Sequence, residues 1–292
     1  MTERMHTVQA KSLLTRWNAM NVYRGCTHGC IYCDSRSSCY QFTHSFEDIE
    51  VKQNAPELLE RTLRSRQKRT MISTGSMSDP YQPCEQTLRL TRQCLRIIEK
   101  YGFGAAVLTK SDRVLEDLPL LRRIHDGAKA VVQISLTCAD DSLSRLIEPC
   151  VCPTSRRAEV LLEMKRAGIP TVVWMTPILP FLTDTRENVN RILDMCFRTK
   201  VRGIVCFQMG LTLRNGSREY YYRQLNRLFP GLVARYERTF GLVQEVESLN
   251  SPELMSLFHE RCAKEGVLHT PEDCFEFTGT LSSELQQLNM FD

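Results

Sequence analysis

Six short runs of apolar and β-branched residues, each followed by a stretch of helical character, constrain the fold of this chain more than any other feature. Near-continuous runs of this kind are typical of strands buried on both faces. The runs cover residues 20–24, 70–74, 104–109, 131–137, 171–176 and 203–208. The helices expected after them cover residues 54–68, 86–101, 114–127, 155–167, 186–199 and 217–228.

This alternation predicts an α/β fold built from parallel βαβ units. Six units are too few to close an eight-stranded barrel, so a partial barrel or an open sheet is expected. The last fifty residues are less regular. We therefore expect a main domain over residues 1–240 and a C-terminal extension over residues 241–292.

The composition favours a protein of the cytoplasm. Charged residues make up 25% and hydrophobic residues 42% of the chain, as in ordinary globular proteins. No apolar run approaches the length needed to cross a bilayer, and the first six residues lack the apolar core of a signal peptide. The net charge of +4 permits an anionic partner without requiring one.

The chain contains 13 cysteines, which is many for a cytoplasmic protein. Disulfides do not persist in that compartment, so some of these thiols are expected to be ligands or reactive groups. Cys94, Cys196 and Cys206 lie inside apolar segments and are expected to be core residues.

The strongest chemical signal is the triplet Cys26, Cys30 and Cys33, with Gly25 and Gly29 allowing a tight loop. Thiolates are the usual ligands of iron–sulfur clusters, which normally take four. Three ligands from one loop would leave a fourth iron open to a substrate or cofactor. The loop also follows the first expected strand directly, which in barrel folds is the catalytic face.

A zinc site is the alternative for the same triplet. Cys39 or His28 would then supply the fourth ligand. In that case the chain would be a non-enzymatic binding module.

The triplet and its surroundings resemble a known family. Cys-x3-Cys-x2-Cys with Tyr32 before the last cysteine resembles the signature of the radical S-adenosylmethionine (SAM) superfamily, and residues 21–33 resemble its spore photoproduct lyase-like branch. The likeness runs from about Lys11 to the C-terminus. Further segments agree with that branch in order: residues 78–83, 109–111, 135–137, 148–149, 156–157, 177–180 and 228–231.

The resemblance implies a partial (β/α)6 TIM-type barrel of the radical SAM kind. It implies a [4Fe–4S] cluster held by Cys26, Cys30 and Cys33, with SAM bound to the open iron. One electron, from a reductant such as flavodoxin or ferredoxin, then cleaves SAM. The resulting 5′-deoxyadenosyl radical takes a hydrogen atom from the substrate, chemistry that belongs to the cofactor.

By position in the family pattern, the expected SAM-binding residues are Tyr32, Ser78, Asp79, Lys110 and Ser135. Lys110 suits the SAM carboxylate as a mobile point charge. The two serine hydroxyls suit the amino or ribose groups. Asp79 is the weaker candidate, because Asp-Pro is common in turns for structural reasons.

Two positions depart from the photoproduct lyases proper. Those enzymes carry a hydrogen-donating cysteine where this chain has Ser76, and an aromatic residue where this chain has Asp34. A hydroxyl is a far poorer hydrogen-atom donor than a thiol, so we do not expect efficient photoproduct repair. Cys84 is a candidate for the replacement thiol, with packing at a helix start as the simpler interpretation.

The expected substrate is nucleic acid, in DNA repair or modification; the alternatives are radical modification of a peptide or a small metabolite. Two clusters suit a nucleic-acid partner: a basic stretch that could bind phosphates, and a group of basic and aromatic residues that could bind phosphates and stack bases. The alternative is a solvated helix face for the first and a packed face of Tyr and Leu, with Arg outside, for the second. The first holds Arg61, Arg64, Arg66, Lys68 and Arg69, and the second holds Arg214, Arg218, Tyr220, Tyr221, Tyr222, Arg223 and Arg227.

The tail suggests a protein partner. Gln287-Leu288-Asn289-Met290-Phe291 resembles the Gln-Leu-x-Leu-Phe peptide by which bacterial repair proteins dock on the DNA sliding clamp. Apolar side chains at a chain end either fold back or fill a partner's pocket. The tail thus has two interpretations: fold-back onto its own domain, or a contact with the sliding clamp as a candidate partner.

Overall fold

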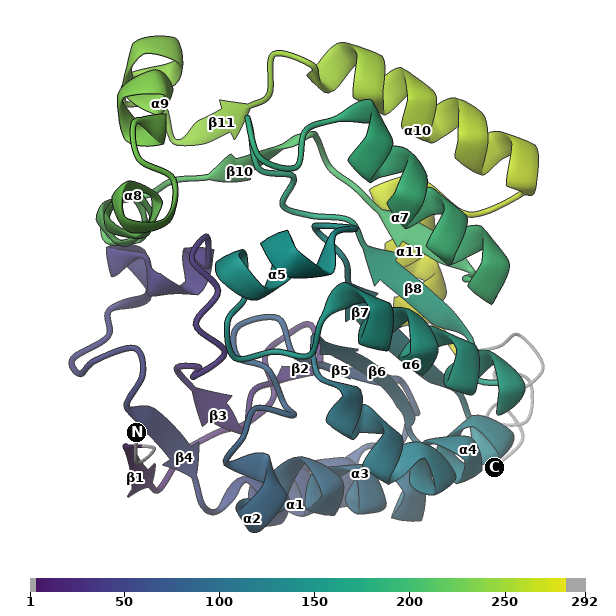
Figure 1. Ribbon diagram of the computed structural model, residues 1–292. Helices are drawn as coiled ribbons and strands as arrows, with labels where there is room; N and C mark the ends of the chain where they lie inside the picture. The colour runs from purple at the N-terminus through teal and green to yellow at the C-terminus, as the bar shows by residue number, and fades with distance from the viewer. Residues whose placement is uncertain (1–3, 282–292) are drawn as a thin grey trace.

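A curved parallel sheet of six strands, with helices over its outer face, forms the body of the protein (Figure 1). The computed structural model describes residues 4–281. The strand order is β2-β5-β6-β7-β8-β9, and every pairing in this sheet is parallel. The strands are β2 (Ala19–Met20), β5 (Met71–Thr74), β6 (Gly104–Thr109), β7 (Ala130–Ser135), β8 (Thr171–Trp174) and β9 (Gly203–Val205). The expected α/β fold of six parallel units is confirmed.

Helices connect successive strands, and their apolar faces build the large core. They are α1 (Ala55–Ser65), α2 (Glu85–Leu88), α3 (Leu90–Lys100), α4 (Leu118–Gly127), α5 (Asp141–Ile147), α6 (Thr154–Arg166), α7 (Arg186–Thr199), α8 (Ser217–Leu228), α9 (Leu232–Phe240), α10 (Ser251–Glu265) and α11 (Pro271–Gly279). Three short 3-10 helices cover Asp34–Arg36, Ser38–Tyr40 and Asp112–Asp117. Helices α7 and α8 have the expected bounds.

Both faces of the sheet are covered, which explains why its strands read as continuous apolar runs. On β7, Val132 and Ile134 join the large core beneath the helices. Val131 points the other way and joins a smaller core with Cys274 of α11 and Leu281. Helix α11 therefore covers part of the concave face of the sheet, where an open barrel would otherwise expose apolar side chains.

A three-stranded sheet of order β1-β4-β3 lies at one side of the body (Figure 1). It contains β1 (Met5–Val8), β3 (Tyr23–Arg24) and β4 (Ile49–Lys52). The expected strand over residues 20–24 is therefore two strands: β2 stays in the main sheet, whereas β3 pairs antiparallel with β4. The buried Tyr23 hydroxyl donates to Glu85, which fixes β3 in this position.

The residues after 240 pack on the rest of the protein as far as Leu281. Strand β11 (Glu245–Glu247) pairs antiparallel with β10 (Gly210–Thr212). Phe258 of α10 belongs to the large core. The division at residue 240 stays a prediction, and the clamp-like peptide lies outside the described residues.

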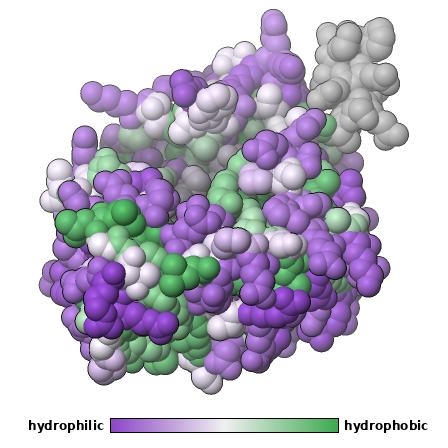
Figure 2. All heavy atoms as spheres, turned by 90° about the horizontal axis from the view of Figure 1, so that it is seen from above, coloured by the Kyte–Doolittle hydropathy of each residue, from purple (hydrophilic) through white to green (hydrophobic). Residues whose placement is uncertain are grey.

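Figure 2 shows a face of the molecule that is mainly hydrophilic, with smaller apolar patches between the polar groups. Among residues 4–281, no helix has the length and apolar character needed to span a bilayer.

Candidate active site

The cysteine loop follows β3 and is held on both sides by backbone hydrogen bonds. The Cys26 amide donates to the Phe46 carbonyl at 3.1 Å, and the Ile31 amide donates to the Ile147 carbonyl at 2.9 Å. Gly25 has φ +91°, and a Cβ there would lie 2.6 Å from the Phe46 oxygen. Only glycine fits this turn without strain.

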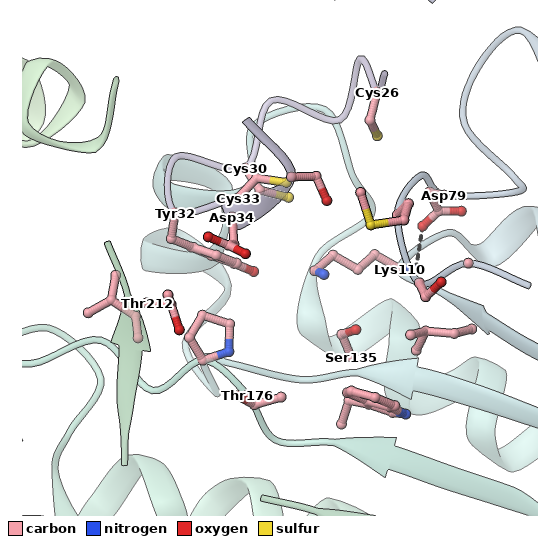
Figure 3. Close-up of a pocket in the computed structure, with 18 of the residues that line it drawn as sticks. Cys26, Cys30, Tyr32, Cys33, Asp34, Asp79, Lys110, Ser135, Thr176 and Thr212 are labelled. Carbon is pink, nitrogen blue, oxygen red and sulfur yellow. Dashed lines mark hydrogen bonds between the residues drawn. The ribbon is translucent and has the colours of Figure 1, made fainter. Parts of the chain in front are cut away.

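The three thiols of the loop line one cavity of about 510 Å³. Figure 3 shows Cys30 and Cys33 close together and Cys26 at a distance from them. Burial raises the pKa of the Cys26 thiol to about 12, so this thiol keeps its proton unless a metal ion displaces it.

The spacing of the thiols fits a cluster better than one metal ion. Within residues 4–281, the three sulfur atoms do not all lie within 4.8 Å of one another. Tetrahedral zinc, with Zn–S bonds of about 2.3 Å, would hold sulfur atoms roughly 3.8 Å apart. An iron–sulfur cluster binds each cysteine at a different iron and takes a wider spacing. The zinc-module alternative gains no support from this geometry.

Asp79 ties the cysteine loop to the end of β6. Its carboxylate accepts from the Thr109 hydroxyl at 2.6 Å and from the Lys110 amide at 2.7 Å. The oxygen that accepts from the Lys110 amide, Oδ2, also lies 3.4 Å from His28 Nδ1. Burial lowers the pKa of His28, so its imidazole is neutral near pH 7. These contacts give Asp79 a positioning role at the cavity wall.

Ser78 also contacts the loop rather than pointing a free hydroxyl into the cavity. Its Oγ donates to the Gly25 carbonyl at 2.6 Å and accepts from Gln82 Nε2 at 3.1 Å. Gln82 in turn accepts from the Thr27 amide at 3.2 Å. Ser78 and Gln82 thus hold the turn that carries Cys26, and SAM binding by Ser78 stays a prediction.

Tyr32 belongs to a buried polar network beneath the loop. Its hydroxyl donates to Glu148, whose second oxygen accepts from Arg157. Burial alone would raise the pKa of Glu148, but the charges of Arg157 and Lys110 hold it below its usual value. In the sequence, Glu148 and Arg157 belong to segments that resemble the family, and no role was predicted for either residue.

Lys110 and Ser135 have the most available polar groups among the predicted SAM contacts. In Figure 3 the Lys110 side chain extends from the end of β6 towards the cysteine loop, and its amine lies 5.9 Å from the Tyr32 ring centre. Within residues 4–281 this amine has no hydrogen-bond acceptor and no ion-pair partner. Ser135 ends β7 beside the same cavity.

Part of the cavity wall is aromatic, and its residues were not predicted from the sequence as site residues. Trp174 and Phe207 line the cavity, with ring centres 6.1 Å apart. Phe275 of α11 packs 5.8 Å from Trp174. The signal in the sequence was that Trp174 and Phe207 stand at the ends of expected strands, although such residues more often belong to a core.

Cys84 does not reach the cavity. It lies in the large core at the start of α2 and is 2% exposed. Ser76 does line the cavity. Among residues 4–281, the cysteines that line it are the three of the loop.

The first basic cluster has no buried residue, whereas the second divides between interior and surface. Arg218 is buried and donates to the carbonyls of Leu213 and Val243. Tyr221 is fully buried, which confirms the packed-face interpretation for that residue. Arg223 and Arg227 remain exposed.

The comparison with protein families decides the class of this site. The family profile described as the radical SAM superfamily matches residues 20–196, which include the cysteine loop and four of the sheet strands that follow it. This chain belongs to the radical SAM superfamily. The suspected family is thereby confirmed, and with it the family's cofactors, a [4Fe–4S] cluster and SAM.

Curated relatives that match this radical SAM protein carry the name of uncharacterized proteins. One from Mycobacterium tuberculosis is 29% identical over 232 residues, covering 76% of this chain and 66% of the relative. One from Methanocaldococcus jannaschii is 30% identical over 167 residues, covering 56% of this chain and 61% of the relative. The chain thus spans slightly less than two thirds of the relatives it matches.

Solved structures of spore photoproduct lyase share the fold. A cysteine-to-serine mutant of that enzyme has a TM-score of 0.64 at 14% identity, covering 91% of this chain and 81% of the lyase chain. The lyase complexed with dinucleoside spore photoproduct has a TM-score of 0.62. At this identity the likeness establishes the architecture of the radical SAM barrel in this protein.

Proposed function

We propose that this protein is a radical SAM enzyme that acts on nucleic acid, with DNA as the preferred class. When bound, the cluster and SAM supply a 5′-deoxyadenosyl radical that removes a hydrogen atom from the substrate. The chain's own residues have three tasks: Cys26, Cys30 and Cys33 hold the cluster, Lys110 pairs with the SAM carboxylate, and the cavity receives the substrate.

The aromatic wall is the observation that carries the choice of substrate. Trp174 and Phe207 line the same cavity as the cysteines, and Phe207 is 52% exposed. A nucleobase has a flat π-face, and stacking on an aromatic side chain contributes about 1–3 kcal/mol per base. Exposed arginines such as Arg223 offer partners for phosphates.

Photoproduct repair itself is not proposed. Ser76 lines the cavity where a cysteine would donate hydrogen, and Cys84 is enclosed in the core. A radical left on a thymine therefore has no thiol within the described cavity apart from the cluster ligands. The solved lyase bound to its dinucleoside supports the class of substrate rather than the reaction.

Deuterium transfer tests the proposed function directly. Reconstituted and reduced protein is incubated with SAM and deuterated DNA, RNA, peptide or nucleoside pools, and 5′-deoxyadenosine is analysed by mass spectrometry. Deuterium incorporation from DNA supports the proposal, whereas incorporation only from peptide would replace it. Cys30→Ala should abolish SAM cleavage and lower the iron content, while the exposed Cys39→Ala should change neither.

A further inference from the structure

A second group of potential metal ligands lies on the small sheet, away from the cysteines. One ligand atom from each of His6, His44 and Glu50 lies within 4.8 Å of the other two. It is the only such set of three within residues 4–281. None of the three residues lines the active-site cavity.

The pairing of the strands explains why two of these residues meet. Ile49 and Val51 of β4 point into the large core, so Glu50 between them points to the other face. In the parallel register of β1 and β4, His6 stands directly beside Glu50. Side chains at paired positions lie on the same face of a sheet. His44 reaches this face from the segment that precedes β4.

His44 has one ring nitrogen in use and one without a hydrogen bond. Its Nδ1 donates to the Ser45 carbonyl at 2.9 Å, which assigns the proton to that nitrogen and leaves a lone pair on Nε2. Nε2 is buried, has no hydrogen-bond partner, and lies 3.7 Å from Glu50 Oε2. A buried acceptor without a donor is costly, which calls for an explanation.

His6 has the corresponding arrangement. Its Nδ1 lies 3.0 Å from Asp48 Oδ1, and donation there leaves Nε2 with the lone pair. Metal-binding histidines commonly donate their other ring proton to a carboxylate or a backbone carbonyl. Asp48 and the Ser45 carbonyl provide one acceptor of each kind.

We propose that His6, His44 and Glu50 bind a zinc ion on the small sheet. Two imidazoles and one carboxylate form a ligand set that zinc uses with water in the fourth position. Tetrahedral bonds of about 2.0–2.2 Å place ligand atoms roughly 3.3–3.6 Å apart, close to the 3.7 Å between His44 Nε2 and Glu50 Oε2. Calcium and magnesium prefer oxygen ligands.

Arg24 is the nearest competing cation and does not occupy the site. Its guanidinium is 3.7 Å from Glu50 Oε2, longer than a hydrogen bond. The same group donates to the carbonyls of Tyr40 at 2.6 Å and Gln41 at 3.1 Å, and it stacks on Phe42.

The ion would tie the N-terminal strand to the segment after the cysteine loop. Phe42, His44 and Phe46 stack edge to face, and Tyr40 just ahead of them lines the active-site cavity. Binding at His44 would therefore order the chain that connects Cys33 to β4. The zinc site thus has a structural role next to the catalytic loop.

Metal titration of the full-length protein tests the site. The cluster-reconstituted protein is freed of loosely bound metal and titrated with Zn²⁺ by calorimetry and with Co²⁺ by visible spectroscopy. The same titration on full-length protein with Cys26, Cys30 and Cys33 all replaced by alanine makes the result independent of the cluster. Co²⁺ at His and Glu ligands shows d–d bands without the charge-transfer band of a thiolate ligand.

The expected result is one Zn²⁺ per chain beyond the cluster. Loss of a residue that only hydrogen-bonds to a metal ligand lowers the metal affinity about 10–100-fold, and this is the loss expected for Asp48→Asn. His44→Ala and Glu50→Gln remove ligands themselves, so each should weaken Zn²⁺ binding at least about 100-fold. The controls His259→Ala, on the exposed face of α10, and Glu47→Gln, paired with Arg36, should leave binding unchanged.

Folding of the variants is checked separately. Zn²⁺ should raise the melting temperature of the parent protein but not that of His44→Ala. The melting temperatures of the two proteins without metal are compared to check that His44→Ala is folded. If His44→Ala unfolds, His44→Gln takes its place. No zinc binding by the parent, binding that survives the His44 and Glu50 substitutions, or a thiolate band in the Co²⁺ spectrum would overturn the proposal.

Discussion

At the scale of single residues, the buried pair Arg157–Glu148 is the main support of the active site. Both side chains are 0% exposed. Arg157 also donates to the Ser135 carbonyl at 2.8 Å and to Ser144 Oγ at 3.0 Å. The pair therefore connects the end of β7 with the Tyr32 side of the cysteine loop. Such pairs hold geometry more than they add stability, but breaking one leaves a buried charge.

Replacing Arg157 by methionine should destabilise the fold by about 3–5 kcal/mol, because Glu148 would remain buried without its cation. Urea unfolding of the metal-free protein measures the loss. The neighbouring Arg156→Met is the matched control, since its ion pairs with Asp112 and Glu159 are partly exposed and should contribute less than about 1 kcal/mol. Equal losses for the two variants would contradict this account.

Lys110→Ala should weaken SAM binding without removing the cluster. The amine has no hydrogen-bond acceptor and no ion-pair partner within residues 4–281, so it is free to bind the SAM carboxylate. Its loss should remove one charge-assisted contact, costing about 1.5–3 kcal/mol. Equilibrium dialysis with labelled SAM measures binding, and iron analysis measures the cluster. Lys100→Ala, whose amine pairs with Glu60 on the surface, is the control. Unchanged SAM binding in Lys110→Ala would remove Lys110 from this role.

At the scale of elements, the turn between β3 and the cysteine loop determines where the ligands stand. Gly25 adopts φ +91°, which lets the chain leave β3 and fold over the end of the sheet. Ser78 and Gln82 both donate to its carbonyl, at 2.6 and 3.3 Å. The loop is thus held before any cofactor binds, which lowers the entropy lost on cluster insertion.

Gly25→Ala should cost about 1–2 kcal/mol from the left-handed backbone alone and more from the close Phe46 carbonyl. We expect lower iron content per chain after reconstitution, because the turn that carries Cys26 must shift. Gly127→Ala is the control: Gly127 has no positive φ, and its added Cβ would meet nothing within 4 Å. Full iron loading of Gly25→Ala would show that the turn tolerates the shift.

At the scale of the whole molecule, the segment after residue 240 shapes the active-site cavity as well as the core. Glu245 at the start of β11 lines the cavity, and Phe275 of α11 supports Trp174. The aromatic wall proposed for a nucleobase therefore depends on the C-terminal segment as well as on the ends of β8 and β9. Truncation before α11 would uncover the concave face of the sheet.

The clamp-like peptide is a prediction of the sequence and lies outside the described residues. A labelled peptide of residues 283–292 should bind a purified sliding clamp with micromolar affinity, because a few apolar anchors carry most of such binding. Fluorescence anisotropy measures it, and the Phe291→Ala peptide is the control. Equal binding of the two peptides, or none at high clamp concentration, would remove the clamp from the list of partners.

The sequence by itself determined the class of fold and predicted the cluster ligands. The runs that form β5 to β9 are apolar at successive positions because both faces of the sheet are buried. This pattern can be recognised in each run by itself, without knowing which strands pair. Cys26, Cys30 and Cys33 were identifiable because all three lie within eight residues, so their spacing alone reflects the geometry of one loop.

Only the tertiary structure decided which polar side chains are available to bind a ligand. Ser78 and Tyr32 resemble SAM contacts in the sequence, yet their hydroxyls bind Gly25 and Glu148. Cys84 lies on the core side of its turn. His6 and His44 are 38 residues apart, and they meet Glu50 only because β1 and β4 pair in one register. Partners this far apart along the chain are selected by strand register and packing, which no local pattern encodes.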